Sequence, residues 1–315
     1  MFVSIIICTY RRPDHLRTVL RSLAAQTYRD FEVLVVDGDN ECEPSRSIAR
    51  SMSDAMEVGV VVSPKGLTRQ RNAGLRAARG GILCLIDDDV EVEEDFLQKI
   101  VSLFAQPDMQ DVGGLSGYDV LNYPQSINAR WRLRRFLGTV PSLEPGAIDR
   151  LGNSAPVSFC PPFSGCRPVG FFYGFCMIFR ATAISGTYFD EELPTYGGED
   201  RDFSFRVAQR WRLLLCGDLR VRHLQTPQSR DSLVRRTYQT GFGAGRTFAK
   251  HRSRYFDYVL LLRSLLCEFL IDCLSFFSHP SWERSRLPFA RAAGLIIGVR
   301  SYRISSPAAV PDTSS

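Results

Sequence analysis

The sequence lacks the glycine-rich signatures that bind nucleotides in two large classes of α/β protein. Neither GxGxxG nor GxxxxGK[ST] occurs at the turns that follow its predicted strands, so neither a dinucleotide site nor a Walker-type site is indicated. It also lacks a strong excess of one charge, because 39 Lys and Arg stand against 34 Asp and Glu, a net charge of +5. No RNA- or DNA-binding motif accompanies this mild basicity, which suits anionic ligands or lipid headgroups but not nucleic acid.

Neither a disulfide framework nor a signal peptide is expected. Nine cysteines are scattered without a second Cys/His pair that would complete a zinc site. Cys160 and Cys166 come nearest to a pair, and a disulfide or zinc role for them is the lesser alternative. Because most of the others lie in apolar runs, we expect buried free thiols in a reducing cytosol. Residues 1–10 show no basic n-region or cleavage site, so no signal peptide is expected.

What the sequence does contain is an unusual acidic cluster after an apolar segment. Residues 82–86 are apolar without alternation, which is typical of a strand buried on both faces of a parallel sheet. Asp87, Asp88 and Asp89 follow at once, and their mutual repulsion would disfavour a compact state unless a cation compensates their charge. Ligands of open α/β sheets collect beyond the carboxyl ends of strands. The cluster therefore suggests a site for a hard divalent ion that carries phosphates, with a solvated acidic turn as the alternative.

Strand and helix patterns alternate along the N-terminal part of the chain. Further buried strands are predicted at 3–8, 31–36 and 58–62, and helices follow near Pro13 and over 68–79. This alternation predicts right-handed parallel crossovers in a doubly wound α/β sheet. Polar residues stand at each strand end, so we expect one nucleotide pocket to be formed by Thr9, Arg11, Asp37, Asp39, Lys65 and the three aspartates.

The second half of the chain is less regular. Residues 122–169 are rich in Pro, Gly and Ser and include a basic aromatic patch at 130–135, which indicates either a functional lid or a solvated surface helix. A strand is expected at 170–179, and two short strands at 213–216 and 219–221 lead to His223. Between them, Gly197 and Gly198 precede Glu199 and Asp200 at a predicted helix start. Helix capping would explain one acid there, but not so many beside two glycines.

Taken together, five motifs resemble the inverting family 2 glycosyltransferases of GT-A fold, in the family's order over about residues 2–225. They are Val3-Ser-Ile-Ile-Ile-Cys-Thr-Tyr-Arg-Arg12, Val35-Val-Asp37-Gly-Asp39, Gly66-Leu-Thr-Arg-Gln-Arg71-Asn72-Ala-Gly74, Ile86-Asp-Asp-Asp89 and Gly197-Gly-Glu-Asp200. The resemblance implies a Rossmann-like, mostly parallel sheet flanked by helices. We expect a catalytic domain over 1–228, a helical extension over 229–305 and a disordered tail over 306–315.

The resemblance also implies roles for individual residues. It assigns donor binding to the strand-end loops, in which Asp37 would read the nucleobase edge and Arg71 would lie beside the phosphates; the full donor set is Thr9, Tyr10, Arg11, Asp37, Lys65, Arg71, Asp87 and Asp88. Family members often carry Asn where Arg11 stands, which leaves the contacts of that loop open. Asp89 and His223 match metal ligands for Mg²⁺ or Mn²⁺, with the choice between Asp88 and Asp89 left open. Asp200 matches the catalytic base.

The implied activity is metal-dependent, inverting transfer of a sugar from a nucleotide-diphospho-sugar to a glycan or lipid-linked acceptor. A cation would stabilise the departing diphosphate, and a carboxylate would take the proton of the acceptor hydroxyl. One alternative is a pseudo-transferase that binds nucleotide or glycan without turnover. Another is a haloacid-dehalogenase-like phosphatase, which is disfavoured because Val90 follows the aspartates where a small hydroxyl residue would be expected.

The C-terminal region has a different pattern. Residues 257–277 are long and apolar enough to suggest a span, but Arg263, Glu268 and Asp272 interrupt them. Ser264, Glu268, Asp272 and Ser275 form one polar stripe, which favours an amphipathic helix lying in a membrane surface over a spanning helix. We therefore expect a cytoplasmic protein held peripherally on the cytoplasmic face of a membrane, and packing of the helix against the domain or a partner is the alternative.

Overall fold

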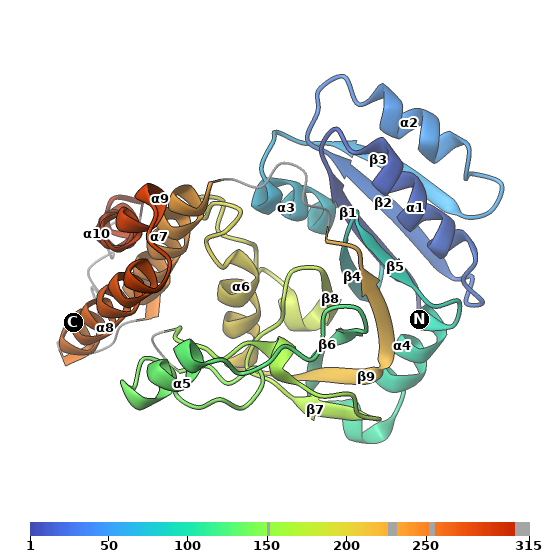
Figure 1. The fold of residues 1–315 in the computed structure, drawn as a ribbon. Helices are drawn as coiled ribbons and strands as arrows, with labels where there is room; N and C mark the ends of the chain where they lie inside the picture. Colours follow the sequence, from blue (N-terminus) through green and yellow to red (C-terminus); the bar gives the residue numbers. More distant parts are fainter. Residues whose placement is uncertain (150–151, 226–231, 252–255, 306–315) are drawn as a thin grey trace, which may run out of the picture.

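In the computed structural model, residues 3–87 form the alternating strand–helix unit that the sequence predicts (Figure 1). The structure describes residues 1–149, 152–225, 232–251 and 256–305. The N-terminal elements are β1 (Val3–Thr9), α1 (Pro13–Ala24), β2 (Phe31–Asp37), α2 (Glu43–Arg50), β3 (Glu57–Val62), α3 (Leu67–Ala77) and β4 (Ile82–Asp87). Strands β3, β2, β1 and β4 pair in parallel in that order.

Alternate side chains of these strands pack on opposite faces of the sheet. On one face, Ile5 and Ile7 pack with the apolar stripe of α1 in one buried core. On the other face, Ile6 and Val36 belong to a second core, against which α3 packs. Strands β1, β2 and β4 are therefore covered on both sides, which explains why they show no polar alternation. The prediction of a buried strand at 58–62 was wrong in its burial, because β3 is the edge strand of the sheet and its residues are exposed or only partly buried.

The remaining strands extend the sheet with mixed directions. They are β5 (Val90–Val92), β6 (Val112–Asp119), β7 (Cys166–Pro168), β8 (Cys176–Arg180) and β9 (Arg212–His223). The full order is β3-β2-β1-β4-β8-β6-β9-β5, with β7 paired to β9. The helices of this part are α4 (Phe96–Phe104), α5 (Ala129–Phe136) and α6 (Glu199–Ala208), with short 3-10 turns at Pro107–Met109, Val157–Phe159 and Ala181–Ile184. Strand β8 runs antiparallel to both neighbours, β4 and β6.

Several sequence predictions were wrong in detail in this part. The strand expected at 170–179 begins only at Cys176, because the preceding residues form the loop that carries Gly174 to the site. The two short strands expected at 213–221 are one strand, β9, whose pairing with β6 has an irregularity between Cys216 and Arg220. The expectation of free thiols fails for one pair, since Cys166 and Cys216 form a disulfide between β7 and β9. The other seven cysteines are free.

Among the described residues after β9 there are four helices: α7 (Leu233–His251), α8 (Phe256–Ser278), α9 (Trp282–Ser285) and α10 (Leu287–Ser305). Helices α7 and α10 pack backbone to backbone, since a Cβ added at Gly245 would lie 2.1 Å from the Leu295 carbonyl oxygen and one at Gly298 2.0 Å from that of Phe242. Small residues at such spacing let helices approach this closely. In the described part of the chain, no helix combines the length and the apolar character that crossing a membrane requires. The predicted tail over 306–315 and the domain boundary at 228 lie outside the described residues.

Candidate functional site

Parallel pairing brings three strand ends together at one edge of the sheet. Thr9 at the end of β1 lies opposite Asp37 of β2, and Cys8 lies opposite Asp87 of β4. The side-chain amide of Gln70, from α3, joins two of these strands by donating to the carbonyl oxygens of Thr9 and Val36 at 2.7 and 2.9 Å. The polar residues that the sequence placed at separate strand ends therefore belong to one surface.

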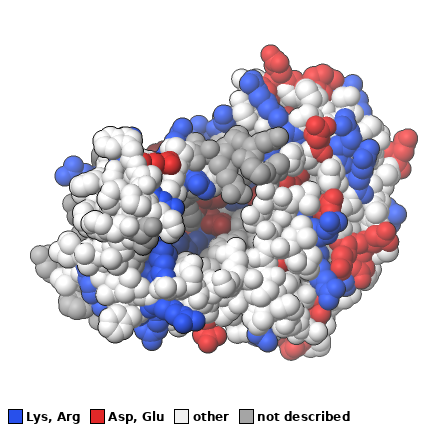
Figure 2. All heavy atoms as spheres, in the orientation of Figure 1, with Lys and Arg blue, Asp and Glu red and all other residues white. Residues whose placement is uncertain are grey.

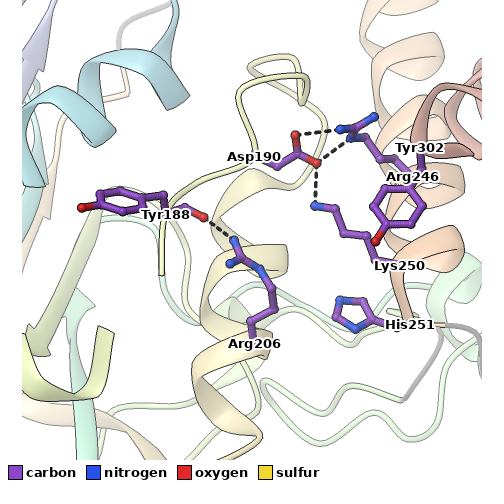
Figure 3. Close-up of a pocket in the computed structure, with 7 residues that line it drawn as sticks. All are labelled: Tyr188, Asp190, Arg206, Arg246, Lys250, His251 and Tyr302. Carbon is purple, nitrogen blue, oxygen red and sulfur yellow. Dashed lines mark hydrogen bonds and ion pairs between the residues drawn. The ribbon is translucent and has the colours of Figure 1, made fainter. Parts of the chain in front are cut away.

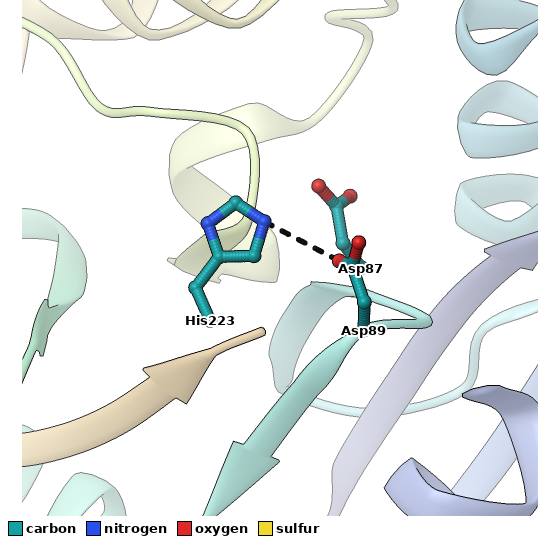
Figure 4. A group of neighbouring side chains, drawn as sticks. All are labelled: Asp87, Asp89 and His223. Carbon is teal, nitrogen blue, oxygen red and sulfur yellow. Dashed lines mark ion pairs between the residues drawn. The ribbon is translucent and has the colours of Figure 1, made fainter. Parts of the chain in front are cut away.

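Asp87, Asp89 and His223 form the densest group of metal-ligating side chains on this edge (Figure 4). Their ligand atoms all lie within 4.8 Å of one another. The pairing of β5 with β9 produces this proximity, because it sets His223 opposite Val90, the residue after Asp89. Two carboxylates and one imidazole are donors that suit a hard or borderline divalent ion such as Mg²⁺ or Mn²⁺, so the residues present fit such an ion.

Burial and mutual pairing set the electrostatics of this group. Burial raises the pKa of Asp87. Burial opposes ionisation of Asp89 too, but hydrogen bonds from His223 and Arg12 hold its pKa at about 2. Burial would lower the pKa of His223, yet the surrounding carboxylates, Asp89 foremost, raise it. The excess of carboxylates over cations here favours any ion that brings further positive charge.

Asp88 points away from this group. Its carboxylate accepts from the Thr9 hydroxyl at 2.8 Å and from Arg12 at 2.5 Å. Arg12 also donates to Asp89 at 3.1 Å and so bridges the two acids. Burial raises the pKa of Asp88 to about 7 in spite of these partners. The structure thus groups Asp89, not Asp88, with His223.

Arg71 is the buried hub of the site. Its guanidinium, only 2% exposed, donates to Asp87 at 3.2 Å, to Glu199 at 3.1 Å and to the carbonyl oxygen of Gly174 at 2.9 Å. A buried arginine is stable only when nearby carboxylates or carbonyl oxygens compensate its positive charge. It therefore ties the end of β4 to the start of α6.

Glu199 and Asp200, adjacent in the sequence, differ in environment. Glu199 is buried against Arg71, and burial raises its pKa to about 8. Asp200 is only half-buried and accepts from the backbone N–H groups of Gly174 and Arg201 at 2.9 and 2.7 Å. Of the pair, Asp200 is therefore the carboxylate open to a bound molecule.

The other predicted donor residues line the same edge. Asp37 is buried, with its two oxygens accepting from the Asp39 N–H at 2.9 Å and the Ser45 hydroxyl at 2.5 Å. Arg11 pairs with Asp39 at 2.6 Å. Lys65 lies over the Tyr10 ring, 4.0 Å from its centroid. The loops after β1, β2 and β3 are thus joined to one another.

Sequence reasoning missed two charged residues of this site. Arg12 neutralises Asp88 and Asp89 from the start of α1, which the sequence offered only as one arginine of a pair. Asp119 is buried at the end of β6, with one oxygen 3.9 Å from Nδ1 of His223. If β6 had been predicted, Asp119 would have been recognised as another acid at a strand end. The strand was missed because glycines are frequent in the sequence of β6.

A cavity of about 400 Å³ lies apart from this group (Figure 3), lined by Tyr188, Asp190, Arg206, Arg246, Lys250, His251 and Tyr302. Its main charges are already paired, because Asp190 accepts from Arg246 at 2.5 Å and lies 2.6 Å from Lys250. None of its residues belongs to the metal-ligating group. Its ion pairs join the loop before α6 to α7.

Comparison with known proteins identifies the family. Residues 4–184 match the family model described as glycosyl transferase family 2, so the chain belongs to that family. Among curated relatives, it is 31% identical to glycosyltransferase AglE of Haloferax volcanii over 118 residues, 36% of this chain and 38% of the relative. It is 26% identical to succinoglycan biosynthesis protein ExoM of Rhizobium meliloti over 259 residues, 79% of this chain and 76% of ExoM. The matched regions span only 38% of AglE, 38% of glucosyl-dolichyl phosphate glucuronosyltransferase of Haloferax volcanii and 29% of putative glycosyltransferase EpsH of Bacillus subtilis.

Solved structures share the fold. The mannosyltransferase PcManGT from Pyrobaculum calidifontis, in complex with GDP-Man and Mn²⁺, aligns at 16% identity with a TM-score of 0.56, covering 96% of this chain and 86% of that one. TarS residues 1–349 from S. aureus, in complex with UDP-GlcNAc, aligns at 17% identity with a TM-score of 0.52, covering 97% and 93%. The fold is therefore GT-A, as the sequence motifs implied.

Proposed function

We propose that this protein is a metal-dependent, inverting glycosyltransferase that uses a nucleotide-diphospho-sugar. One observation carries the proposal: the Asp87, Asp89 and His223 group is linked through Arg71 to the start of α6, where the half-exposed Asp200 lies. A site for the leaving diphosphate and a proton acceptor are thus held by one buried network.

Asp89 and His223 would hold Mg²⁺ or Mn²⁺, with Asp87 beside them. When bound, such an ion would offset the charge that develops on the departing diphosphate. The structural relative PcManGT supports this use of the fold, since it is in complex with GDP-Man and Mn²⁺. Asp119 would orient His223 from behind, as outer partners of metal-bound imidazoles commonly do.

The chain's own residues would perform the remaining steps. Asp200 would accept the proton of the acceptor hydroxyl, and the N–H of Gly174 would hold its carboxylate in place. A single base facing a single leaving group supports one displacement, with inversion at the anomeric carbon. Glu199 would act through Arg71 as a positioning residue.

The loops after the strands would bind the donor. Asp37 would contact the nucleobase edge, Arg71 the phosphates and Asp87 the ribose, with Thr9, Tyr10, Arg11, Lys65 and Asp88 completing the pocket. The acceptor would be a glycan or a lipid-linked sugar. Relatives named chondroitin synthase of Escherichia coli and glucosyl-dolichyl phosphate glucuronosyltransferase of Haloferax volcanii support these two classes.

The test compares two isosteric variants. Asp200→Asn keeps the shape and removes the base, so sugar transfer should fall by on the order of 10²–10⁴ with donor affinity little changed. Glu199→Gln should reduce transfer less. Full activity of Asp200→Asn would refute its assignment as the base.

A binding measurement separates the enzyme from a pseudo-transferase. Calorimetry should show that Mn²⁺ strengthens binding of a nucleoside diphosphate, and that Asp89→Ala removes this Mn²⁺ effect. Unchanged Mn²⁺ dependence in Asp89→Ala would overturn the metal assignment. Mn²⁺-dependent binding by the wild-type chain, with no transfer to any of a panel of acceptors, would favour the pseudo-transferase.

A further inference from the structure

Helix α8 carries its acidic side chains on the side that faces the protein. Asp272 is fully buried and accepts from Arg130 of α5 and Arg291 of α10, each at 2.7 Å. Glu268 accepts two hydrogen bonds from Arg134, at 2.7 and 2.6 Å. The acidic part of the polar stripe thus packs against neighbouring helices, as in the alternative that the sequence left open.

The opposite side of α8 is apolar and open. Six large apolar side chains recur every three or four residues, and more than half of the surface of each is exposed: Val259, Leu262, Leu266, Leu270, Leu274 and Phe277. Residues at this spacing share one face of a helix. An exposed apolar face of this size usually marks a surface that binds another protein or a membrane.

Helix α10 continues this apolar surface. The ring of Phe289 lies 5.9 Å from that of Phe269 on α8, so the two helices adjoin there. Phe289, Ile296 and Ile297 are exposed on α10. We call these three residues and the six of α8 the apolar helical face. Figure 2 shows this lobe, at the left of the view, as a largely uncharged surface with Lys and Arg along its lower edge.

The exposed charges around this face are almost all positive. Arg286, the residue before α10, and Arg300 on α10 are both exposed, and they flank the exposed apolar residues of that helix. Each lies seven residues, about two helical turns, from position 293. Arg263 is exposed on α8. On the adjoining α5, Phe136 is exposed beside Arg132 and Arg135, which are exposed as well. Among the described residues of 256–305, Glu283 is the one exposed acid.

We propose that the apolar helical face rests on an anionic lipid bilayer, with the flanking arginines against the headgroups. An in-plane helix combines an apolar side with basic flanks, and the negative potential of a cytoplasmic leaflet attracts such flanks. Charge complementarity selects this occupant over a second copy of the chain, because a self-pairing face would bring its own arginines together. The face lies outside the donor site, so membrane binding does not depend on the proposed chemistry.

Co-sedimentation of the full chain with vesicles tests the proposal. The chain should bind phosphatidylcholine vesicles that contain phosphatidylglycerol, and salt should weaken binding because surface charges are screened. Leu266→Glu with Leu270→Glu should lower the partition coefficient about tenfold or more. The matched control is Gln98→Glu with Ser102→Glu, which adds the same charge to two exposed positions on α4 and should leave binding nearly unchanged.

A second variant keeps the proposal open to refutation if the leucine variant fails to fold, as judged by circular dichroism. Arg286→Gln with Arg300→Gln should weaken binding to anionic vesicles and hardly alter binding to pure phosphatidylcholine. Equal partitioning of the wild type, the leucine variant and the arginine variant would overturn the proposal. So would a vesicle-independent dimer, seen by sedimentation, that the leucine substitutions dissociate, since the face would then bind a second copy.

Discussion

Replacing Gly243 by alanine tests whether the C-terminal helices position the acidic loop of the site. Gly243 lies on α7 where the helix backbone meets the loop before α6. A Cβ added there would lie 1.7 Å from the carbonyl oxygen of Gly197, whereas real Cβ atoms essentially never come within 3.0 Å of another heavy atom. The atoms of Gly197 that the Cβ would meet are backbone atoms, so no side chain can rotate to relieve the contact. The loop must therefore move by more than 1 Å.

This displacement acts close to the proposed base. Gly197 and Gly198 lead directly into Glu199 and Asp200. Gly198 is the N-cap residue of α6, and its positive φ of 74° is one that residues other than glycine rarely adopt. A misplacement of about 1 Å in a positioned catalytic group costs on the order of 10²-fold in rate. We therefore expect Gly243→Ala to lower sugar transfer about 10²-fold. Mn²⁺-dependent binding of a nucleoside diphosphate should change little, because Asp89 and His223 lie on other elements.

Gly245→Ala is the matched control. It also lies on α7, but its Cβ would meet the Leu295 carbonyl oxygen of α10 at 2.1 Å instead of the loop. Both variants should therefore lower the melting temperature, and only Gly243→Ala should strongly reduce transfer per folded molecule. Equal transfer rates in the two variants would refute the positioning role of α7.

Two further predictions concern stability. Arg71→Met should destabilise the fold by about 3–5 kcal/mol in urea unfolding, because it leaves the buried Glu199 and the partly exposed Asp87 without their cation. Adding Glu199→Gln should restore part of the loss, and a variant as stable as the wild type would contradict the central role of Arg71. Arg246 and Lys250 outweigh burial at Asp190, and His251, Lys250 and Arg206 outweigh it at Asp202, so the pKa values of both acids lie below the ordinary 3.8. Their stabilisation is therefore present above about pH 4 and is lost as pH falls through the lower folded values. The urea midpoint should therefore drop on acidification below pH 4, and Asp202→Asn should make that drop shallower; parallel curves for the two proteins would exclude the contribution of Asp202.

Local patterns carried much of the fold in the sequence. The apolar runs of β1, β2 and β4 and the stripe of α1 are buried as predicted. Such segments are determined by their own composition, because an unbroken apolar run must be covered on both faces. Strand β6 escaped prediction because Gly113, Gly114 and Gly117 lower its strand propensity. Those glycines are required by neighbours from elsewhere: a Cβ at Gly114 would lie 2.8 Å from Phe179.

The sequence by itself also determined the acidic cluster after β4 and the family motifs. Only the tertiary structure decided which acids act together. The pairing of β5 with β9 sets His223 beside Asp89, while Thr9 and Arg12 draw Asp88 away. It also decided which side of α8 faces outward, since Arg130 and Arg134 lie more than a hundred residues earlier and attract its acids inward. Helical periodicity defines two faces, but the direction of each depends on partners that no local window contains.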